Sequence, residues 1–450
     1  MSFKQTNIFD FLVDTLSSNT DKIKDSRRQR SDLKYRLKDI ILSAFAVFYF
    51  QSSSWLGFQR NMQSLKGSSN CQTMFGIENI PTDNHIRNVL DTISPNDFKP
   101  VYDSIIKQLD KLKVLNKFQF MDNYILVALD GTQYHSSKKI SCKCCQTKTD
   151  TQSGEIHYYH SAITPTIVHP KLNRVLPLMQ EFISNNDGKE KQDCEVNASK
   201  RWLDSFISPF IQKVIVMGDD LYSREPMIQK VLQKNHSYIF IAKKESHKYL
   251  YEQIDIIKNL QTIDTKKVSK MVNGKKQLFT YNYINQLSLT NPNGKTNTPP
   301  QEVNWCELIV TDANGKKLYH NSFITDITLY QNNVMDITQA GRTRWKIENE
   351  NNNVLKTKGY NLEHNFGHGK EYLSQTLCSL NILAFLFHTV QDLRDELYGD
   401  LRDEIGTREE FFTAISFLST MFRFKSFEKM LEYIQISRRS DENISLDGYV

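Results

Sequence analysis

Residues 124–131 read YILVALDG, and residues 214–220 read VIVMGDD. Both are short apolar runs typical of buried β-strands, and both reach aspartate where the chain would leave the sheet. Similar runs occur in YYHSAITPTIVH (158–169), VLPLMQEFI (175–183) and YIFIAKK (238–244). Between these runs, residues 194–207 and 226–233 repeat apolar side chains at helical spacing. Strands that alternate with helices predict an α/β protein with a mixed sheet flanked by helices on both faces.

The remaining sequence divides the chain into further regions. Residues 1–118 carry helical patterns and no convincing strand, which predicts an α-helical N-terminal domain. Residues 245–330 are polar and lysine-rich with turn signals at Asn273-Gly274 and Asn314-Gly315, which predicts a β-rich insertion. We expect the sheet-containing core to occupy residues 119–244 and 331–400, and a charged helical tail to occupy residues 401–450.

Composition excludes some classes of protein and leaves others open. The longest uninterrupted apolar stretch, residues 40–50, is too short to cross a bilayer, and the N-terminus lacks a secretory pattern. We therefore expect a cytoplasmic protein with no membrane partner. The seven cysteines are an odd number and do not resemble a disulfide framework, so we expect them to be reduced. A net charge of +6 permits a polyanionic partner without requiring one.

A basic cluster lies in the N-terminal region. Arg27, Arg28 and Arg30 are followed by Lys34, Arg36 and Lys38, and the cluster runs directly into the apolar segment at Ile40. These side chains would either contact a DNA backbone or form the solvated face of a helix beside the core. The sequence leaves both interpretations open.

Three carboxylates stand out by their positions. Asp130 and Asp219 end predicted strands, and ligands of open α/β sheets bind at the carboxyl ends of strands. The alternative is that each aspartate caps a helix or forms a turn. Glu348 lies on a predicted helix, four residues after Arg344 and on the same face, where a surface ion pair is the alternative.

Carboxylates that converge without a cation repel one another, so such a cluster favours binding of a hard divalent metal. Ligation by oxygen alone suits magnesium or manganese better than zinc. Two such ions about 3.5 to 4 Å apart can activate a nucleophile and stabilise the leaving oxygen of a phosphodiester. The three carboxylates thus suggest cleavage and joining of nucleic-acid strands.

Several segments, in this order along the chain, carry a resemblance to a known family: IPTDNHIRNVLD, ALDGTQYHSSKKISCKCC, YYHSAITP, KQDCEVNASKRW, GDDLYSREP, VNWCELIVTD, FITD and GRTRWKIENENNNVLKTKGYNLEHNFGHGK. They resemble the DDE transposases of bacterial insertion sequences, in the branch with a β-rich insertion between the second aspartate and the glutamate. The resemblance implies an RNase H-like core in which Asp130, Asp219 and Glu348 are catalytic and hold two magnesium ions, with manganese able to substitute. Arg344 and Lys356 would hold the DNA terminal phosphate.

The chain departs from the family pattern at two positions. Gly341 stands where the family has a tyrosine three residues before the arginine, and Leu355 stands where it has a lysine seven residues after the glutamate. In addition, Asp220 beside Asp219 and Glu350 near Glu348 leave the assignment open by one or two residues. Strand geometry and the order Arg-Trp-Lys-Ile-Glu favour Asp219 and Glu348.

The function implied by the resemblance is metal-dependent cleavage at element ends and strand transfer into target DNA. The partners would be double-stranded DNA, as terminal inverted repeats and target, and a second copy of the chain in a homodimer on DNA. The N-terminal domain, 1–118, would bind DNA. An RNase H-like endonuclease or resolvase without strand transfer, and a catalytically silent DNA-binding protein, are the alternatives.

Cysteines and histidines form a second candidate cluster. Cys142 and Cys145 have zinc-ligand spacing and precede His157 and His160, although a reduced loop without metal fits the same pattern. The two histidines are three positions apart in a predicted strand and would point to opposite faces. His364 and His368 would contact DNA or cap the next helix, and Trp345 would pack in the core.

Overall fold

The computed structural model describes residues 7–28, 33–52, 54–184, 193–291, 300–439 and 448–449. It is a mixed α/β structure with a mixed sheet and helices, as predicted. The large sheet has the order β11-β12-β13-β14-β10-β9-β2-β6-β7, and β1 pairs with β2. Its strands are β1 (Gln119–Phe120), β2 (Tyr124–Ala128), β6 (Thr166–His169), β7 (Leu172–Pro177), β9 (Lys213–Gly218), β10 (Ser237–Ile241), β11 (Asp264–Val272), β12 (Lys275–Ser288), β13 (Glu302–Asp312) and β14 (Lys317–Thr325).

The centre of the large sheet is parallel and its flanks are antiparallel. Strand β9 runs parallel to both β2 and β10, whereas β6 is antiparallel to β2 and β14 is antiparallel to β10. The predicted β-rich segment therefore extends the same sheet through β14. The central strands are almost entirely buried, which explains why their sequences are continuous apolar runs.

The predicted insertion also contains a helix that the sequence interpretation missed. Helix α9 (Lys248–Asn259) buries Leu250 and Ile254 at a spacing of four. Its many polar residues hid this narrow apolar face. The turn signal at Asn273-Gly274 is correct: both residues have positive φ, 49° and 73°, and they connect β11 to β12.

A smaller sheet has the order β3-β5-β4, with β8 beside β5. Its strands are β3 (Gly131–Ser137), β4 (Gln146–Thr149), β5 (Ile156–Ile163) and β8 (Glu181–Ile183). The hairpin formed by β2 and β6 in the large sheet continues as β3 and β5 in the small one. At the crossing, the Thr164 amide donates to the Asp130 carbonyl at 3.0 Å. Asp130 thus lies where the chain passes between the sheets.

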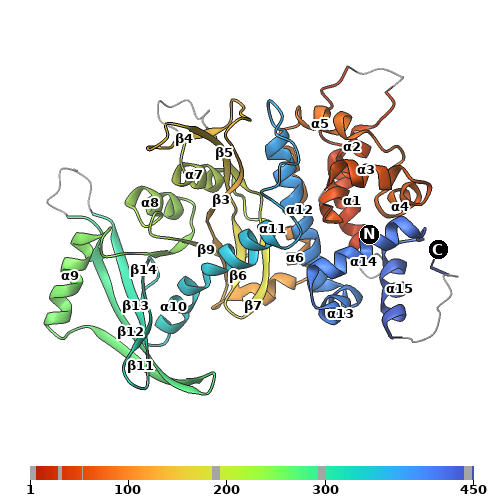
Figure 1. Ribbon diagram of the computed structural model, residues 1–450. Coiled ribbons are helices and arrows are strands. Elements are labelled where there is room, and N and C mark those ends of the chain that lie inside the picture. Colours follow the sequence, from red (N-terminus) through yellow and green to blue (C-terminus); the bar gives the residue numbers. More distant parts are fainter. Residues whose placement is uncertain are drawn as a thin grey trace.

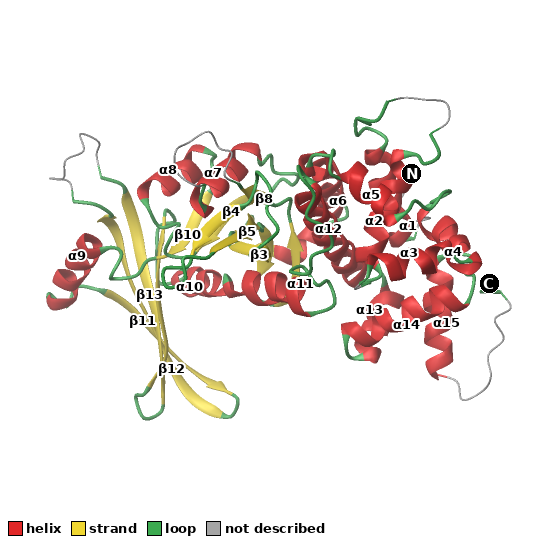
Figure 2. Cartoon of the chain, turned by 45° about the horizontal axis from the view of Figure 1, so that its top comes forward, coloured by secondary structure: helices red, strands yellow, loops and turns green. Residues whose placement is uncertain are grey.

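Helices cover both faces of the large sheet. In Figures 1 and 2, α7 (Glu195–Ser205) and α8 (Glu225–Gln233) lie on one side, and α10 (Val334–Thr343) and α11 (Asn353–Thr357) lie on the other. A π-helical turn, η3 (Ile347–Asn352), joins α10 to α11. Turns of this type are rare and occur often at functional sites.

The two ends of the chain build one helical body beside the sheets (Figure 1). Its N-terminal part is α1 (Ile8–Thr20), α2 (Leu37–Tyr49), α3 (Trp55–Gln63), α4 (Leu65–Phe75), α5 (Asp83–Leu90), η1 (Pro95–Phe98), α6 (Lys99–Lys111) and η2 (Val114–Phe118). Its C-terminal part is α12 (Leu373–Arg394), α13 (Glu396–Ile405), α14 (Arg408–Met421) and α15 (Phe427–Arg439).

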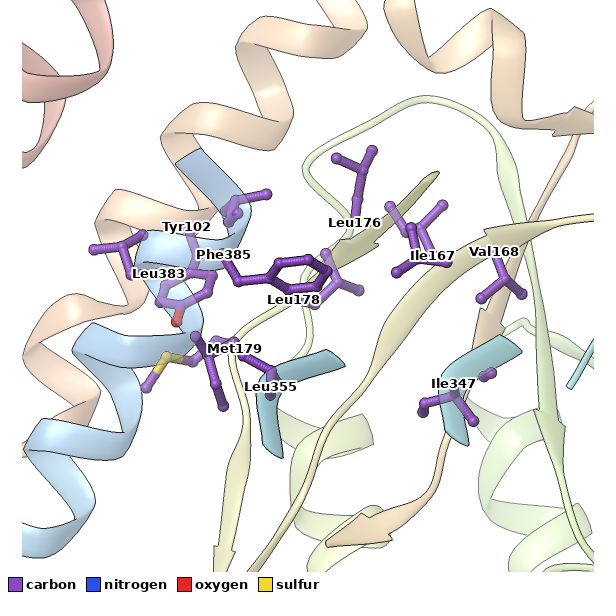
Figure 3. Close-up of a cluster of buried hydrophobic side chains, with 14 of the residues drawn as sticks. Tyr102, Ile167, Val168, Leu176, Leu178, Met179, Ile347, Leu355, Leu383 and Phe385 are labelled. Carbon is purple, nitrogen blue, oxygen red and sulfur yellow. The ribbon is translucent and has the colours of Figure 1, made fainter. Parts of the chain in front are cut away.

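Helix α12 is the centre of this body. The Phe45 and Phe387 rings lie 4.6 Å apart, and the Tyr49 hydroxyl donates to Gln391 Oε1 at 2.7 Å, so α12 packs against α2. On its other side, Phe385 points toward strand residues of the large sheet such as Leu176 (Figure 3). Within the described residues, α12 alone is long and apolar enough to cross a membrane, yet its apolar stretch is wholly buried, as in the core helix of a soluble protein.

His388 on α12 makes the stability of this body depend on pH. Its Nδ1 lies 2.7 Å from the Tyr360 hydroxyl, and its ring packs on Tyr49 and Phe412. Burial, with the nearby positive charge of Arg408, lowers the pKa of His388 well below its usual value. The unfolded chain binds a proton below about pH 6.5 while the folded chain resists it, so this stability is lost as pH falls from there.

We expect His388→Gln to flatten the fall in unfolding temperature between about pH 7 and about pH 5, since the residue that titrates is removed. Thermal unfolding at several pH values measures this slope. His157→Gln, on the small sheet, is the comparison variant that removes a histidine elsewhere in the fold. An unaltered slope in the His388 variant would contradict the assignment.

Candidate functional site

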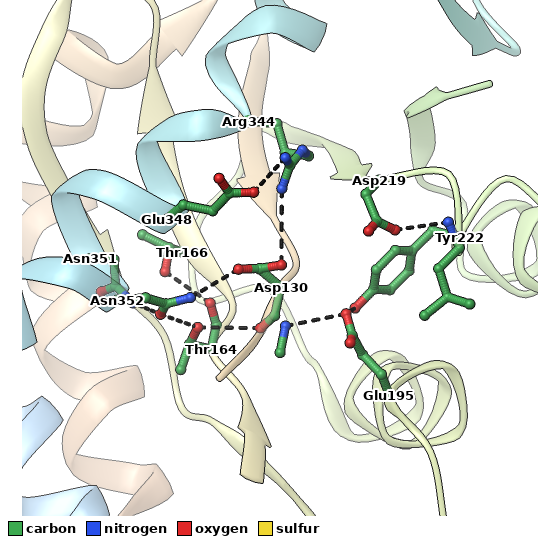
Figure 4. A network of polar contacts seen from close by, with 12 residues as sticks. Asp130, Thr164, Thr166, Glu195, Asp219, Tyr222, Arg344, Glu348, Asn351 and Asn352 are labelled. Carbon is green, nitrogen blue, oxygen red and sulfur yellow. Dashed lines mark hydrogen bonds and ion pairs between the residues drawn. The ribbon is translucent and has the colours of Figure 1, made fainter. Parts of the chain in front are cut away.

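The register of β2 against β9 brings two aspartates together. Ala128 is paired with Met217, and the Leu129 amide donates to the Met217 carbonyl at 2.8 Å. Because the strands are parallel, Asp130 and Asp219 follow at the same level, two residues beyond this pair. Figure 4 shows both carboxylates at the same end of the strands. The structure therefore brings together the two strand-end residues that the sequence singled out.

The neighbouring Asp220 has a different environment. Its carboxylate accepts hydrogen bonds from the Lys243 amide, at 2.7 Å, and from the Ser246 hydroxyl, and His247 Nε2 lies 3.7 Å away. These contacts fasten the β9–α8 connection to the segment after β10. The Asp219 carboxylate instead accepts a local hydrogen bond from the Leu221 amide at 2.8 Å. Asp219 is thus the residue directed at Asp130.

Arg344 connects the third carboxylate to the first. Its Nη2 lies 2.5 Å from Glu348 Oε1, and its Nη1 lies 3.9 Å from Asp130 Oδ1 (Figure 4). Asn352, on the same π-helical turn as Glu348, donates from Nδ2 to Asp130 Oδ2 at 3.0 Å. Thr164 in turn donates to Asn352 Oδ1 at 2.8 Å. Glu350 instead acts electrostatically on Lys346 and Arg174.

A fourth carboxylate, Glu195, belongs to the same site and was missed by the sequence interpretation. Its Oε1 accepts hydrogen bonds from the Gly131 amide at 3.2 Å and the Tyr222 hydroxyl at 2.7 Å. A Cβ on Gly131 would lie 2.7 Å from Glu195 Oε2, so a larger residue at position 131 would displace the Glu195 carboxylate. Gly218 similarly makes room for the Tyr222 ring, which a Cβ would meet at 2.6 Å. An acidic residue at the start of a helix is too common to signal this role.

The clustered charges act on one another. Burial, followed by the negative charge of Glu195, raises the pKa of Asp130 to about 7; Glu348 and Asp219 add to the rise and Arg344 opposes it. Burial also raises the pKa of Glu195, and the charge of Asp219 contributes. The site therefore holds more negative charge than Arg344 neutralises.

The basic residues proposed for DNA contact have varied surroundings. Arg27 pairs with Asp25 at 2.7 Å and donates to the Tyr35 carbonyl at 3.0 Å, whereas Arg28 is exposed. Arg30 lies outside the described residues. Lys356 on α11 pairs with Glu363 at 2.8 Å.

The two departures from the family pattern have structural reasons. A Cβ on Gly341 would lie 2.5 Å from the Phe323 ring, so β14 occupies the space that a larger side chain would need. Leu355 is fully buried, a position unsuited to a lysine that contacts DNA, and Lys356 follows it at the surface.

The prediction that Trp345 packs in the core is wrong, because its side chain is 40% exposed. Lys346 takes the buried position instead. Its Nζ donates to the carbonyls of His169 at 3.0 Å, of Pro170 at 3.2 Å and of Leu172, which together close the β6–β7 turn around the ammonium group. Backbone carbonyls can satisfy a buried ammonium group, and hydrophobicity alone does not reveal such an arrangement.

Cys142, Cys145, His160 and His368 place one ligand atom each within 4.8 Å of one another and could hold a metal such as zinc. His160 joins this group and His157 does not, in line with their opposite faces on β5. His368 comes from the loop before α12 and was not connected to the cysteines by sequence. Within the described residues, this is the one group of possible metal ligands whose atoms lie so close together. The carboxylates of Asp130, Asp219 and Glu348 do not form such a group, so a magnesium site is not established.

Comparison with known proteins adds no identification. No protein-family model matches this chain, and no curated protein matches it. The function must therefore be argued from the geometry and chemistry of the site itself.

We expect Asp130→Asn to raise the unfolding temperature in buffer free of divalent cations. Burial, followed by repulsion from Glu195, raises the pKa of Asp130, and the resulting destabilisation is absent below about pH 4, grows as pH rises toward about 7, and is complete above it. The gain in stability should therefore be larger at about pH 8 than at about pH 5. Thermal unfolding at both pH values tests this.

Asp220→Asn provides the matched control, because that carboxylate accepts hydrogen bonds from Lys243 and Ser246 and should lose stability when neutralised. If both substitutions destabilise equally at high pH, the electrostatic description of Asp130 is incorrect.

Proposed function

We propose that this chain is a DNA transposase that cleaves DNA at element ends and joins the freed strands to target DNA. The proposal rests on the positions of three carboxylates. Asp130 and Asp219 lie at the ends of adjacent parallel strands, and Arg344 lies between Asp130 and Glu348 and contacts both. Carboxylates gathered in this number repel one another, which is costly unless they serve a ligand or a reaction. Their chemistry fits phosphodiester cleavage.

The proposal includes an RNase H-like core. Such a core needs three antiparallel strands continued by two parallel strands, with acidic residues at the strand ends. The order β7-β6-β2-β9-β10 has this sequence of directions, and β2 and β9 carry the two aspartates. The strands β11 to β14 lie beyond β10, between the second aspartate and the glutamate, as the resemblance requires.

The donor set fits magnesium or manganese. Asp130, Asp219 and Glu348 offer only oxygen ligands, and the raised pKa of Asp130 marks an excess of negative charge that a divalent cation would relieve. When bound, two such ions would activate the nucleophile and stabilise the leaving oxygen. The carboxylates would hold them, and Asn352 would fix the orientation of Asp130 by its hydrogen bond.

Arg344 has two roles in this proposal. In the present arrangement its guanidinium offsets part of the negative charge of Asp130 and Glu348. Its planar group of donors also suits a phosphate oxygen of DNA. The exposed Trp345 ring adjoins it and provides a surface on which a base of a frayed DNA end could stack.

DNA recognition in this proposal uses the N-terminal helices and the exposed basic residues near Arg28. The chain would act as a homodimer on DNA, because two ends must be joined in one event and twofold pairs are the commonest assembly. It would work in the cytoplasm, where the nucleoid lies. An endonuclease or resolvase would cut without joining, and a silent DNA-binding protein would do neither.

We expect Asp130→Ala, Asp219→Ala and Glu348→Ala each to lower cleavage and strand transfer by at least about 10³-fold while DNA binding persists, because the basic residues proposed to contact phosphates, Arg344 included, remain in place when a metal ligand is removed. Gel assays with labelled end DNA and a target plasmid measure all three quantities. Magnesium or manganese should support the reaction, and calcium should support binding without efficient turnover.

Glu350→Ala is the matched control, since it lies on the same helical turn as Glu348 and should retain activity. Cleavage without joining by the unaltered protein would favour the endonuclease or resolvase alternative. If all three alanine variants cut DNA, the carboxylate mechanism fails.

We expect Arg28→Ala to weaken DNA binding about equally for all sequences and to reduce the slope of log affinity against log salt by about 1, because one phosphate contact is lost. Fluorescence anisotropy at several salt concentrations measures the slope. Arg27→Ala is the contrasting variant: it removes the ion pair with Asp25 and should lower stability. An unchanged salt slope for Arg28→Ala would remove this region from the DNA-binding surface. Deleting residues 1–118 is a poor test, since α2 and α6 pack on α12.

A further inference from the structure

The geometry points to a structural zinc site formed by Cys142, Cys145, His160 and His368. Two thiols and two imidazoles converge from three separate parts of the chain: the β3–β4 connection, strand β5 and the loop before α12. The inference goes beyond the proposed DNA chemistry, because it concerns a different metal at a different place.

The separations between the ligand atoms match the edges of a tetrahedron. The two sulfurs lie 3.8 Å apart, three of the four sulfur–nitrogen pairs lie 3.3 to 3.5 Å apart, and the two Nε2 atoms lie 3.1 Å apart. All four atoms lie within 4.8 Å of one another. A tetrahedral zinc ion with ordinary bond lengths requires about 3.8 Å between sulfurs, about 3.5 Å between sulfur and nitrogen, and about 3.3 Å between nitrogens. The sulfurs are also too far apart for a disulfide.

Hydrogen bonds alone do not account for this cluster. His160 Nε2 lies within 3.5 Å of three other atoms, Cys142 Sγ, Cys145 Sγ and His368 Nε2. A neutral imidazole nitrogen either donates one hydrogen or accepts one, so it cannot satisfy three neighbours that face one another. A central cation binds all four atoms at once.

The surrounding groups support the ligand geometry. The Cys145 amide donates to the Cys142 carbonyl at 3.2 Å, and the Cys142 amide donates to Cys145 Sγ at 3.4 Å, so the short loop holds both sulfurs on one side. His368 Nδ1 lies 3.2 Å from the Gly369 carbonyl, which favours a proton on Nδ1 and leaves Nε2 free to bind metal.

Burial and charge favour zinc in a closed, structural role. Cys145 is 2% exposed and His160 is 1% exposed, so the cluster is inaccessible to a substrate and unsuited to thiol nucleophilic chemistry. Two thiolates balance the charge of a divalent ion. Four protein ligands of the Cys₂His₂ type leave no open position for water, as in structural zinc sites.

The site would brace the carboxylate centre from both sides. The strand β3 begins directly after Asp130 and pairs with β5, which carries His160; the loop that carries His368 follows the helical turn of Glu348. Asp91 also holds this loop in place, since its carboxylate accepts hydrogen bonds from the backbone amides of Lys370, Glu371, Tyr372 and Leu373. The metal would thus hold the loop to the small sheet.

The first experiment measures metal in the full-length protein. Elemental analysis after purification should find one zinc per chain, and X-ray absorption should show two sulfur ligands at about 2.3 Å and two nitrogen ligands at about 2.0 to 2.1 Å. Cobalt(II) in place of zinc should give the visible absorption of a tetrahedral site with thiolate ligands. Chelation should lower the unfolding temperature by several degrees, and zinc should restore it.

Matched variants locate the site. Cys145→Ser and His368→Asn should each lose most of the bound zinc, whereas Cys144→Ser and His157→Asn should keep it. Should a ligand variant fail to fold, the absorption spectrum of the unaltered protein still decides. A folded protein that carries no zinc and takes up no cobalt overturns the inference, as does equal loss from Cys144→Ser. None of these metal measurements involves DNA, so their failure leaves the proposed function standing.

Discussion

The parallel pairing of β2 with β9 sets the relative position of the two aspartates in the carboxylate centre, because both strands end at the same level. Asp130 and Asp219 are neighbours for this reason, although 89 residues separate them in the chain. A shift of one residue in this register would direct one carboxylate into the apolar core. The buried Val and Ile side chains on both faces of these strands prevent the shift, so the hydrophobic core determines the geometry of a polar site.

The same arrangement has an energetic cost. Burial, followed by the negative charges of Glu195, Glu348 and Asp219, raises the pKa of Asp130 to about 7, and each pKa unit corresponds to about 1.4 kcal/mol. Arg344 and Asn352 reduce this cost through their contacts with Asp130, and the glycines at 131 and 218 allow Glu195 and Tyr222 to pack closely. Strain of this kind is common at sites that bind or react, where stability is given up for function.

The sequence predicted the parts of the structure that depend on local patterns. Apolar runs indicated the central strands, strand ends indicated Asp130 and Asp219, and a spacing of four linked Arg344 to Glu348. What it missed depends on contacts between distant segments. Glu195, at the start of α7, reaches the site by accepting a hydrogen bond from the Gly131 amide at the start of β3, and His368 meets Cys145 across 223 residues.

Burial of polar groups was also hard to anticipate. Lys346 is buried with three backbone carbonyls around its ammonium group, whereas the neighbouring Trp345 is exposed. Hydrophobicity alone assigns these two neighbours the wrong way round. Helix α9 escaped notice for a related reason, since only two of its side chains are fully buried.

The central place of α12 has a consequence for the synthesis of the chain. Helices α1, α2 and α6 leave the ribosome long before α12, yet the apolar side chains of Phe45 and Tyr49 find their partners on it. The N-terminal helices must therefore wait, with apolar surface uncovered, until about residue 394 has been made. Domain-by-domain folding from the N-terminus is excluded for this body. A nascent chain of this kind is exposed to aggregation and is a natural client for chaperones that shield apolar segments during translation.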